Sequence, residues 1–328
     1  MDLFYRPFFL LRLLAAAVVC CLIGVPGLAA GNAPARFTIA YQPGLGYAPL
    51  LIIKQTGWIE KDFPQTTVDW RELANGATIR DGMISDTIQV GTVGTAPYLV
   101  GWDRGVEWKV IASTSNMDLW LTTLDPNIKS LKDIKPGQQI ATPALDAIQA
   151  FVLRKGADDE LHNPHALDAN IVTLPHPQGL LALMNHQVVL HFTSPPFEFE
   201  EADKGAHVVY SSQQAFGNTT FTCTTMTQSF YDRYPEFATK FLEYMQRADK
   251  LINSDPATAA KYIAEAEGKP QLADQYKAWM TRKGINYTVT PSGFLKYAAF
   301  MKKIGTISKV PASIKDLELP PAQRLGGS

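Results

Sequence analysis

The sequence has few cysteines and no strong excess of charge of either sign. Of its 3 cysteines, Cys20 and Cys21 lie in an N-terminal apolar run, and only Cys223 lies in the rest of the chain. Without that N-terminal segment no intramolecular disulfide can form, so the core must stabilise the fold. The 30 basic and 31 acidic residues give a net charge of −1. Nucleic-acid binding needs a basic surface that this composition does not provide, and we expect no nucleic-acid partner.

Common catalytic motifs are also missing. The chain has no Gly-x-Ser-x-Gly elbow, no Walker-type loop and no His-Glu-x-x-His pair. Cys223 lies in an alternating polar and apolar run, which favours a buried thiol over a nucleophile. The histidine spacing fits no compact metal motif, so we favour solvated or singly hydrogen-bonded side chains. The histidines concerned are His162, His165, His176, His186 and His191. We therefore expect neither an enzyme nor a bound cofactor or metal.

The N-terminus has the layout of a secretory signal. Two arginines precede an apolar run over residues 13–25, and small residues follow it. A membrane anchor is the alternative, because the run approaches the roughly 20 apolar residues that a spanning helix needs. A proline and two glycines interrupt the run, however. We predict a signal peptide over residues 1–30, cleaved near Ala29 or Ala30, and a periplasmic product.

In the rest of the chain, short β-rich runs alternate with amphipathic helical stretches, which predicts an α/β fold. Gly57 is expected to end the first helix, and Asp255-Pro256 to begin a later one. A strand is predicted at residues 87–91. Thr142-Pro143 is predicted to open a helix in which Leu145 and the apolar residues after it recur at helical spacing.

The length after cleavage suits two lobes rather than one small core. Two segments are predicted to cross between the lobes, at residues 113–123 and 219–225. The first lobe is then expected over residues 37–116 and 220–315, and the second over residues 117–219.

Several strand-to-helix turns share small, polar, proline-containing sequences. In open α/β sheets, ligands bind beyond the carboxyl ends of the strands, where helix N-termini present unpaired N–H groups and positive dipole ends. Small residues allow an anion to approach the backbone, and neutral donors avoid burying an unpaired cation. Ordinary helix capping is the alternative at each turn. The candidate ligand-binding residues are Tyr41, Gln42, Gly46, Tyr47, Thr92, Gly94, Thr95, Ser115, Thr142, Thr193 and Ser194.

Residues 76–83, followed by residues 86–97, resemble the nitrate, taurine and alkanesulfonate binding-protein family of ABC importers. Residues 128–137 resemble the segment that opens the family's second lobe, and Asp255-Pro256 with residues 259–261 resembles its late helical motif. The family also includes receptors for thiamine precursors. The resemblance implies a two-lobed, type II-like periplasmic-binding-protein fold with crossing strands and a central cleft that closes on its ligand.

The resemblance also implies a function. By this resemblance the chain is expected to be a monomeric receptor that binds a small anionic solute, such as a sulfonate, a sulfate ester or nitrate. The receptor would deliver this solute to a membrane permease. Residues 188–197 lack the acid and tryptophan of sulfonate-type members, so taurine, whose ammonium needs an acidic partner, is disfavoured. A pyrimidine- or thiamine-precursor binding protein, or an enzyme on the same fold, is the alternative.

For two groups of side chains the sequence allows either a structural or a binding role. Glu198, Glu200 and Glu201 are predicted to form an exposed helix face, with docking onto a permease as the alternative. Four aromatic residues could stack on a ligand, although core packing alone would explain them. These are Tyr41, Tyr47, Trp120 and Phe192.

Overall fold

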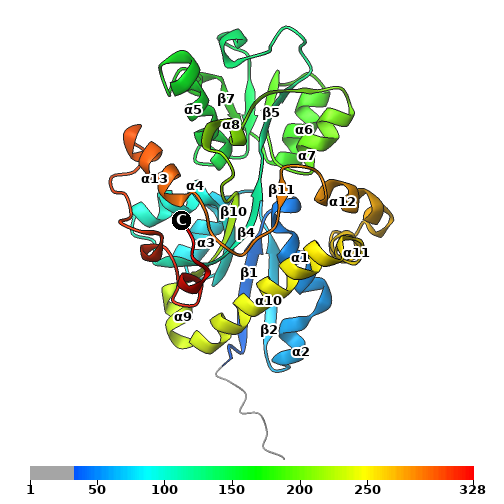
Figure 1. The fold of residues 1–328 in the computed structure, drawn as a ribbon, viewed down its shortest axis with the longest axis vertical. Coiled ribbons are helices and arrows are strands. Elements are labelled where there is room, and N and C mark those ends of the chain that lie inside the picture. The colour runs from blue at the N-terminus through cyan, green and yellow to red at the C-terminus, as the bar shows by residue number, and fades with distance from the viewer. Residues whose placement is uncertain (1–32) are drawn as a thin grey trace, which may run out of the picture. The chain divides into compact units, whose positions relative to one another are not determined.

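The computed structural model describes residues 33–328, whose path is shown in Figure 1. The predicted signal peptide over residues 1–30 lies outside the described part of the chain. Residues 33–328 form two separate β-sheets, each with its own helices. None of the helices in this range combines the length and apolar character needed to cross a membrane.

The first sheet has six strands in the order β11-β4-β10-β3-β1-β2. Strand β1 pairs in parallel with β2 and β3, while β10 lies antiparallel between β3 and β4. Strands β1 and β3 are almost wholly buried, as expected for central parallel strands. The strands are β1 (Arg36–Tyr41), β2 (Thr67–Glu72), β3 (Val90–Gly94), β4 (Trp108–Met117), β10 (Thr222–Thr227) and β11 (Ile285–Asn286).

Four helices connect the parallel strands of this sheet. Gly57 ends the first of them in the left-handed conformation, with φ of 61°, as its position predicts. The Asn75 side chain caps another by accepting a hydrogen bond of 3.0 Å from the Thr78 N–H. Helices α1, α3 and α4 each follow a parallel strand, so they begin at the carboxyl edge of the sheet. The helices are α1 (Ala48–Thr56), α2 (Trp58–Asp62), α3 (Gly76–Ile84) and α4 (Thr95–Asp103).

The second sheet has five strands in the order β7-β6-β8-β5-β9. Strand β6 is parallel to β7 and β8, and β5 is antiparallel to β8 and β9. Its strands are β5 (Trp120–Thr123), β6 (Ile140–Thr142), β7 (Ile171–Thr173), β8 (Leu190–Phe192) and β9 (His207–Ser211). Its helices are α5 (Ile148–Leu161), α6 (His176–Met184), α7 (Phe197–Asp203) and α8 (Ser212–Phe216).

The rest of the chain is largely helical. Phe237, Phe241 and Met245 recur every four residues and are buried, so α10 packs one face against α1 and β4; Figure 1 shows it crossing the first sheet. Asp255 Oδ1 accepts a hydrogen bond of 3.1 Å from the N–H of Thr258, which confirms the predicted helix start. These helices are α9 (Gln228–Arg233), α10 (Pro235–Ser254), α11 (Pro256–Ala266), α12 (Ala273–Met280) and α13 (Phe294–Lys303).

Two short connections in the described chain join the sheets. One leads from β4 into β5, and the other leads from α8 into β10. The strands of the second sheet all fall within residues 120–211, whereas the first sheet takes strands from both sides of that range. The predicted lobe boundaries at residues 116 and 219 stay a prediction.

Side-chain hydroxyls line the central strand β10. Thr224 Oγ1 lies 2.8 Å from Thr92 Oγ1 and 3.0 Å from Thr114 Oγ1. Ser115 Oγ lies 2.8 Å from Thr222 Oγ1. We call these five residues the hydroxyl seam. Because all of them are buried, the seam satisfies hydroxyls that would otherwise be costly inside the sheet.

One strand begins later than its sequence pattern predicts. The N–H groups of Thr87 and Ile88 both donate to the carbonyl oxygen of Gly82, at 2.9 and 3.1 Å. These bonds close the end of α3, so the predicted strand at residues 87–91 is extended only from Val90.

Candidate ligand-binding site

Five helices begin around one small cavity, which we call the first cavity. They are α1, α3 and α4 beside the first sheet and α5 and α6 beside the second. The cavity has a volume of about 20 Å³, which is room for a single water-sized molecule. It is lined by Gln42, Tyr47, Asn75, Gly76, Gly94, Pro97, Pro143, Ala144, Asp146, Ala147, Ile148, Gln149, His176 and Phe221.

The electrostatics of this cavity favour an anion. Each helix N-terminus presents unpaired backbone N–H groups and the positive end of a helix dipole. Asn75 caps α3, but the N-cap residues of the other four helices make no side-chain cap, so the N–H groups beyond them have no capping side chain. No Lys or Arg of residues 33–328 lines the cavity. Its positive character therefore comes from the backbone.

Two contacts join elements beside the first sheet to elements beside the second. The Arg80 guanidinium on α3 lies 2.6 Å from Oδ2 of Asp146, the one carboxylate in the lining. This pairing offsets a negative charge that would oppose an anion. The Leu45 N–H, which follows β1, donates to the carbonyl oxygen of Pro195, which follows β8, at 2.9 Å. With a volume of about 20 Å³, the cavity has no room for a solute of more than a few atoms.

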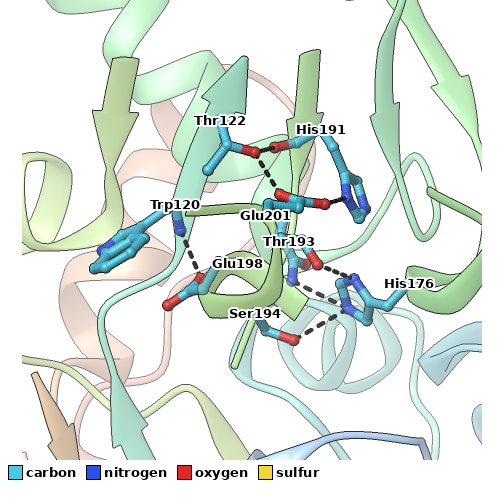
Figure 2. Close-up of polar contacts among 9 residues, drawn as sticks. Trp120, Thr122, His176, His191, Thr193, Ser194, Glu198 and Glu201 are labelled. Carbon is cyan, nitrogen blue, oxygen red and sulfur yellow. Dashed lines mark hydrogen bonds and ion pairs between the residues drawn. The ribbon is translucent and has the colours of Figure 1, made fainter. Parts of the chain in front are cut away.

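His176 is the most polar ring in the cavity wall. Its Nδ1 lies 2.9 Å from Thr193 Oγ1, and its Nε2 lies 3.3 Å from Ser194 Oγ and 3.4 Å from Gln149 Nε2; Figure 2 shows the two hydroxyls reaching the ring. Burial, and then the neighbouring His191, lower the pKa of His176 to about 3. The imidazole is therefore neutral at neutral pH and serves as a hydrogen-bonding group rather than a charge.

A buried polar network supports this wall from behind (Figure 2). His191 Nδ1 lies 2.5 Å from Glu201 Oε1, and Thr122 Oγ1 donates to Glu201 Oε2 at 2.5 Å. Both His191 and Glu201 have no solvent exposure. A Cβ on Gly179 would overlap His191 Nε2, so the α6 backbone fits closely against the ring. The network fixes β5, β8 and α7 to one another.

The predicted exposed acidic face on α7 is wrong. Glu198 and Glu201 are both fully buried. Glu198 Oε2 accepts a hydrogen bond of 3.0 Å from the Trp120 N–H, and burial raises the pKa of Glu198 well above its usual range. Only Glu200 keeps partial exposure. These acids hold the second sheet together, so they do not form a docking surface.

The predicted site residues fall into two groups. Gln42, Tyr47 and Gly94 line the first cavity. Thr193 and Ser194 contact it through His176. These five come from the turns after β1, β3 and β8, where the strand-to-helix pattern places them.

The other six candidates lie behind the cavity wall. Tyr41 OH accepts a hydrogen bond from Lys54 Nζ at 3.0 Å, and the Thr95 hydroxyl donates to the Thr220 carbonyl at 2.7 Å. The Gly46 carbonyl accepts from Thr222 Oγ1 at 2.8 Å, and Thr142 Oγ1 lies 3.3 Å from the Ala144 carbonyl. Thr92 and Ser115 belong to the hydroxyl seam. A direct ligand contact from these residues stays a prediction.

Several lining residues were not predicted as ligand contacts. The segment after β6 forms a turn, and α5 begins at Ile148 rather than at Thr142-Pro143. Leu145 is 57% exposed as a result, whereas Asp146 and Gln149 reach the cavity. From the sequence, His176 was weighed only as a metal ligand against a solvated or singly hydrogen-bonded ring. Its place directly after Pro175, at a helix start that follows β7, is a signal that could have identified it.

The aromatic and thiol candidates are part of the packing. Phe192 is fully buried, and Trp120 packs edge-on against Phe199 at 5.3 Å between ring centroids. Cys223 is a buried free thiol whose pKa is raised by burial. No group of three His, Cys, Asp or Glu side chains in residues 33–328 is placed to hold a metal ion.

Known proteins share the fold of the chain. The profile of the NMT1-like family matches residues 30–266. The alkanesulfonate-binding protein SsuA from Xanthomonas axonopodis pv. citri, solved with MOPS bound, is 19% identical, with a TM-score of 0.68 over 84% of this chain and 95% of that one. The periplasmic nitrate-binding protein NrtA from Synechocystis PCC 6803 is 15% identical, with a TM-score of 0.68 over 88% and 87%.

A third structure comes from a eukaryote. The Candida albicans CA3427 product, described as having the generic periplasmic binding protein fold, is 12% identical, with a TM-score of 0.64 over 87% of this chain and 94% of that one. A comparison with curated protein sequences gave no match. At these identities the structures establish the fold, and the predicted periplasmic-binding-protein architecture is confirmed.

Proposed function

Since the chain belongs to the NMT1-like family, we propose that it is a solute-binding receptor of an ABC-type importer and binds a small anion in the first cavity. One observation carries this proposal: five helix N-termini converge on a cavity whose lining has no cationic side chain. Neutral donors suit a receptor that must also remain folded when empty, because they leave no unpaired cation behind.

The receptor works by capture and delivery. Arg80–Asp146 and Leu45–Pro195 separate to admit the anion and form again around it. The anion favours the closed arrangement because only there do helices from both sheets surround it. A permease that recognises the closed arrangement then receives loaded receptors selectively. Export to the periplasm, predicted from the leader, places the receptor where such a permease would collect its solute.

The alternative of an enzyme gains no specific support. It would need a cluster of reactive side chains in the cavity, and His176 is the one His or Cys in the described lining. Cys223 lies within β10 and away from that lining.

A thermal-shift screen of the mature chain tests the proposal. We expect a sulfonate, a sulfate ester or nitrate to raise the melting temperature in a saturable way, because a ligand that binds only the folded state stabilises it. Calorimetry on the responding anion should give a single site. The neutral amide or alcohol of the same carbon skeleton is the control and should give no shift. Stabilisation by pyrimidines but by no anion would contradict the proposal.

A further inference from the structure

A second cavity lies on the other side of the ring that His176 presents to the first. Phe197 stacks on His176 with 5.6 Å between ring centroids and 16° between planes. His176 lines the first cavity, and Phe197 lines the second. The second cavity has a volume of about 200 Å³, several times the share of a water molecule. Its walls come from the turn after β1, from α1, the end of β2, the start of α6, α7 and the segment from α11 to α12.

The walls of the second cavity carry an excess of negative charge. Glu72, Glu200 and Glu267 line it, together with one cation, Lys269. Lys269 Nζ is 3.8 Å from Glu267 Oε2, which is too long for a strong hydrogen bond. Burial raises the pKa of both Glu200 and Glu267, and for Glu267 the Glu72 carboxylate is the next cause. The three carboxylates therefore lack a full set of positive partners.

An unpartnered hydroxyl faces these carboxylates. Tyr276 is 5% exposed and lines the cavity, yet within residues 33–328 its hydroxyl has no hydrogen-bond partner. Its pKa is raised first by burial and then by Glu267, Glu200 and Glu72 in turn. This hydroxyl and the three carboxylates belong to the lining of the same cavity. The hydroxyl can therefore accept a hydrogen bond from a donor placed in the cavity.

Aromatic rings complete the lining. Tyr276 and Trp279 meet edge to face at 5.6 Å between centroids, and Phe197 belongs to the same lining. Ring faces attract cations, so the rings and the carboxylates favour the same kind of ligand. A metal ion does not fit, because no three acidic or histidine side chains of the described chain are placed to hold one. The cavity suits a larger cation with apolar surface.

We propose that the second cavity binds the ammonium group of a small organic cation, between the three carboxylates and the rings of Phe197, Tyr276 and Trp279. The ammonium belongs either to a free amine or to the far end of a solute whose anionic end lies in the first cavity. Only the second case rests on the proposed function. Because elements beside both sheets line the second cavity, an occupant there also favours the closed arrangement.

Calorimetry with two cations of different donor capacity tests this assignment. Ethylammonium can donate hydrogen bonds, and tetramethylammonium cannot. We expect saturable binding of both, weakened roughly tenfold in Glu267→Gln and in Glu200→Gln by loss of a charged partner. Glu265→Gln, on α11 two residues before Glu267 but outside the lining, is the matched control and should bind as the unchanged chain does.

Tyr276→Phe separates the hydroxyl from the ring. It should weaken ethylammonium binding about threefold to tenfold, because a hydrogen bond to a charged donor is lost, and leave tetramethylammonium binding unchanged. Melting temperatures of all variants show whether each remains folded. The proposal is overturned if neither cation binds saturably to the unchanged chain, or if binding persists undiminished in both glutamine variants.

A third arm identifies the source of the ammonium. An aminoalkanesulfonate series of increasing length is titrated into the unchanged chain, Glu267→Gln and Gln149→Leu. If binding of the aminoalkanesulfonates weakens in both Glu267→Gln and Gln149→Leu, one solute spans the two cavities. Cation binding that depends on Glu267 alone identifies a separate amine. Anion binding is scored with alkanesulfonates that lack nitrogen, so failure of the anion receptor and failure of the cation site give different results.

Discussion

The two cavities on either side of the His176–Phe197 stack select charge by opposite means. The first surrounds about 20 Å³ with helix N-termini and neutral side chains. The second surrounds about 200 Å³ with carboxylates and aromatic rings. Backbone dipoles cannot be removed by a single substitution, whereas a carboxylate can. Selectivity for an anion should therefore resist mutation in the first cavity, and selectivity for a cation should depend on individual residues in the second.

The largest expected effect comes from removing the support behind the first cavity. Glu201→Ala leaves His191 and Thr122 without their buried partner. We expect the free energy of unfolding to fall by about 2–6 kcal/mol, because two buried polar groups each lose a partner at about 1–3 kcal/mol. Urea denaturation measures it. Glu243→Ala, whose side chain is 56% exposed beside Lys240, should cost at most about 1 kcal/mol. Equal losses would show that the buried network is unimportant.

Gln149→Leu tests a neutral donor in the first cavity. The change keeps the volume approximately and removes an amide from the lining. Anion affinity should fall by about 1.5–3 kcal/mol if the amide donates to the bound charge, and affinity for ammonium ions should not change. Calorimetry on both ligands provides the comparison. Gln187→Leu, at an exposed position beside the same sheet, is the control. If anion affinity is unchanged, the hydrogen-bond donors to the bound anion are backbone N–H groups alone.

Substitutions at two threonines distinguish a residue that supports the wall of the first cavity from one in the packing behind that wall. In Thr95→Val the hydroxyl lost is one that donates to the Thr220 carbonyl. Stability should fall by about 1 kcal/mol with little change in anion affinity. In Thr193→Val the partner of His176 Nδ1 is lost, and anion affinity should fall by about 1 kcal/mol. Denaturation and calorimetry on both variants measure stability and anion affinity. A loss of anion affinity in Thr95→Val but not in Thr193→Val would show that Thr95 belongs to the binding surface.

The smallest expected effect concerns closure. Arg80→Met removes the ion pair with Asp146 that joins elements of the two sheets, and we expect it to cost the closed arrangement at most about 1 kcal/mol. Small-angle scattering without ligand should show a slightly larger radius of gyration. Arg71→Met breaks a pair with Asp69 of the same length, 2.6 Å, within one strand. The same expansion in both variants would mean that the Arg80 pair has no special role in closure.

The sequence predicted those residues of the first cavity's lining whose positions depend on local chain direction. Gln42, Tyr47 and Gly94 follow buried parallel strands, and the glycines and prolines there mark each turn. The hydroxyls of Thr92 and Thr95 belong to the same turns but bond to Thr224 and to the Thr220 carbonyl, more than a hundred residues away. No local pattern shows such a partner.

The acidic residues were misjudged for the same reason. Glu198 and Glu201 recur on a short helix like any solvated face, but their partners come from β5 and β8. The second cavity was likewise not visible, because Glu72, Glu200 and Glu267 lie on three separate segments. The absence of an acid near residues 188–197 disfavoured an ammonium-bearing solute, whereas the folded chain supplies acids from elsewhere.

The place of β10 in the first sheet has a consequence for chain growth. The second sheet is continuous in sequence, and its five strands are complete once Ser211 has been synthesised. The first sheet is not continuous in sequence, because β10, the strand that pairs with both β3 and β4, begins at Thr222. A nascent chain that ends before Thr222 therefore contains one whole sheet and one divided sheet. The long sequence separation of these pairings slows their formation, so the second sheet is the part of the molecule suited to fold first.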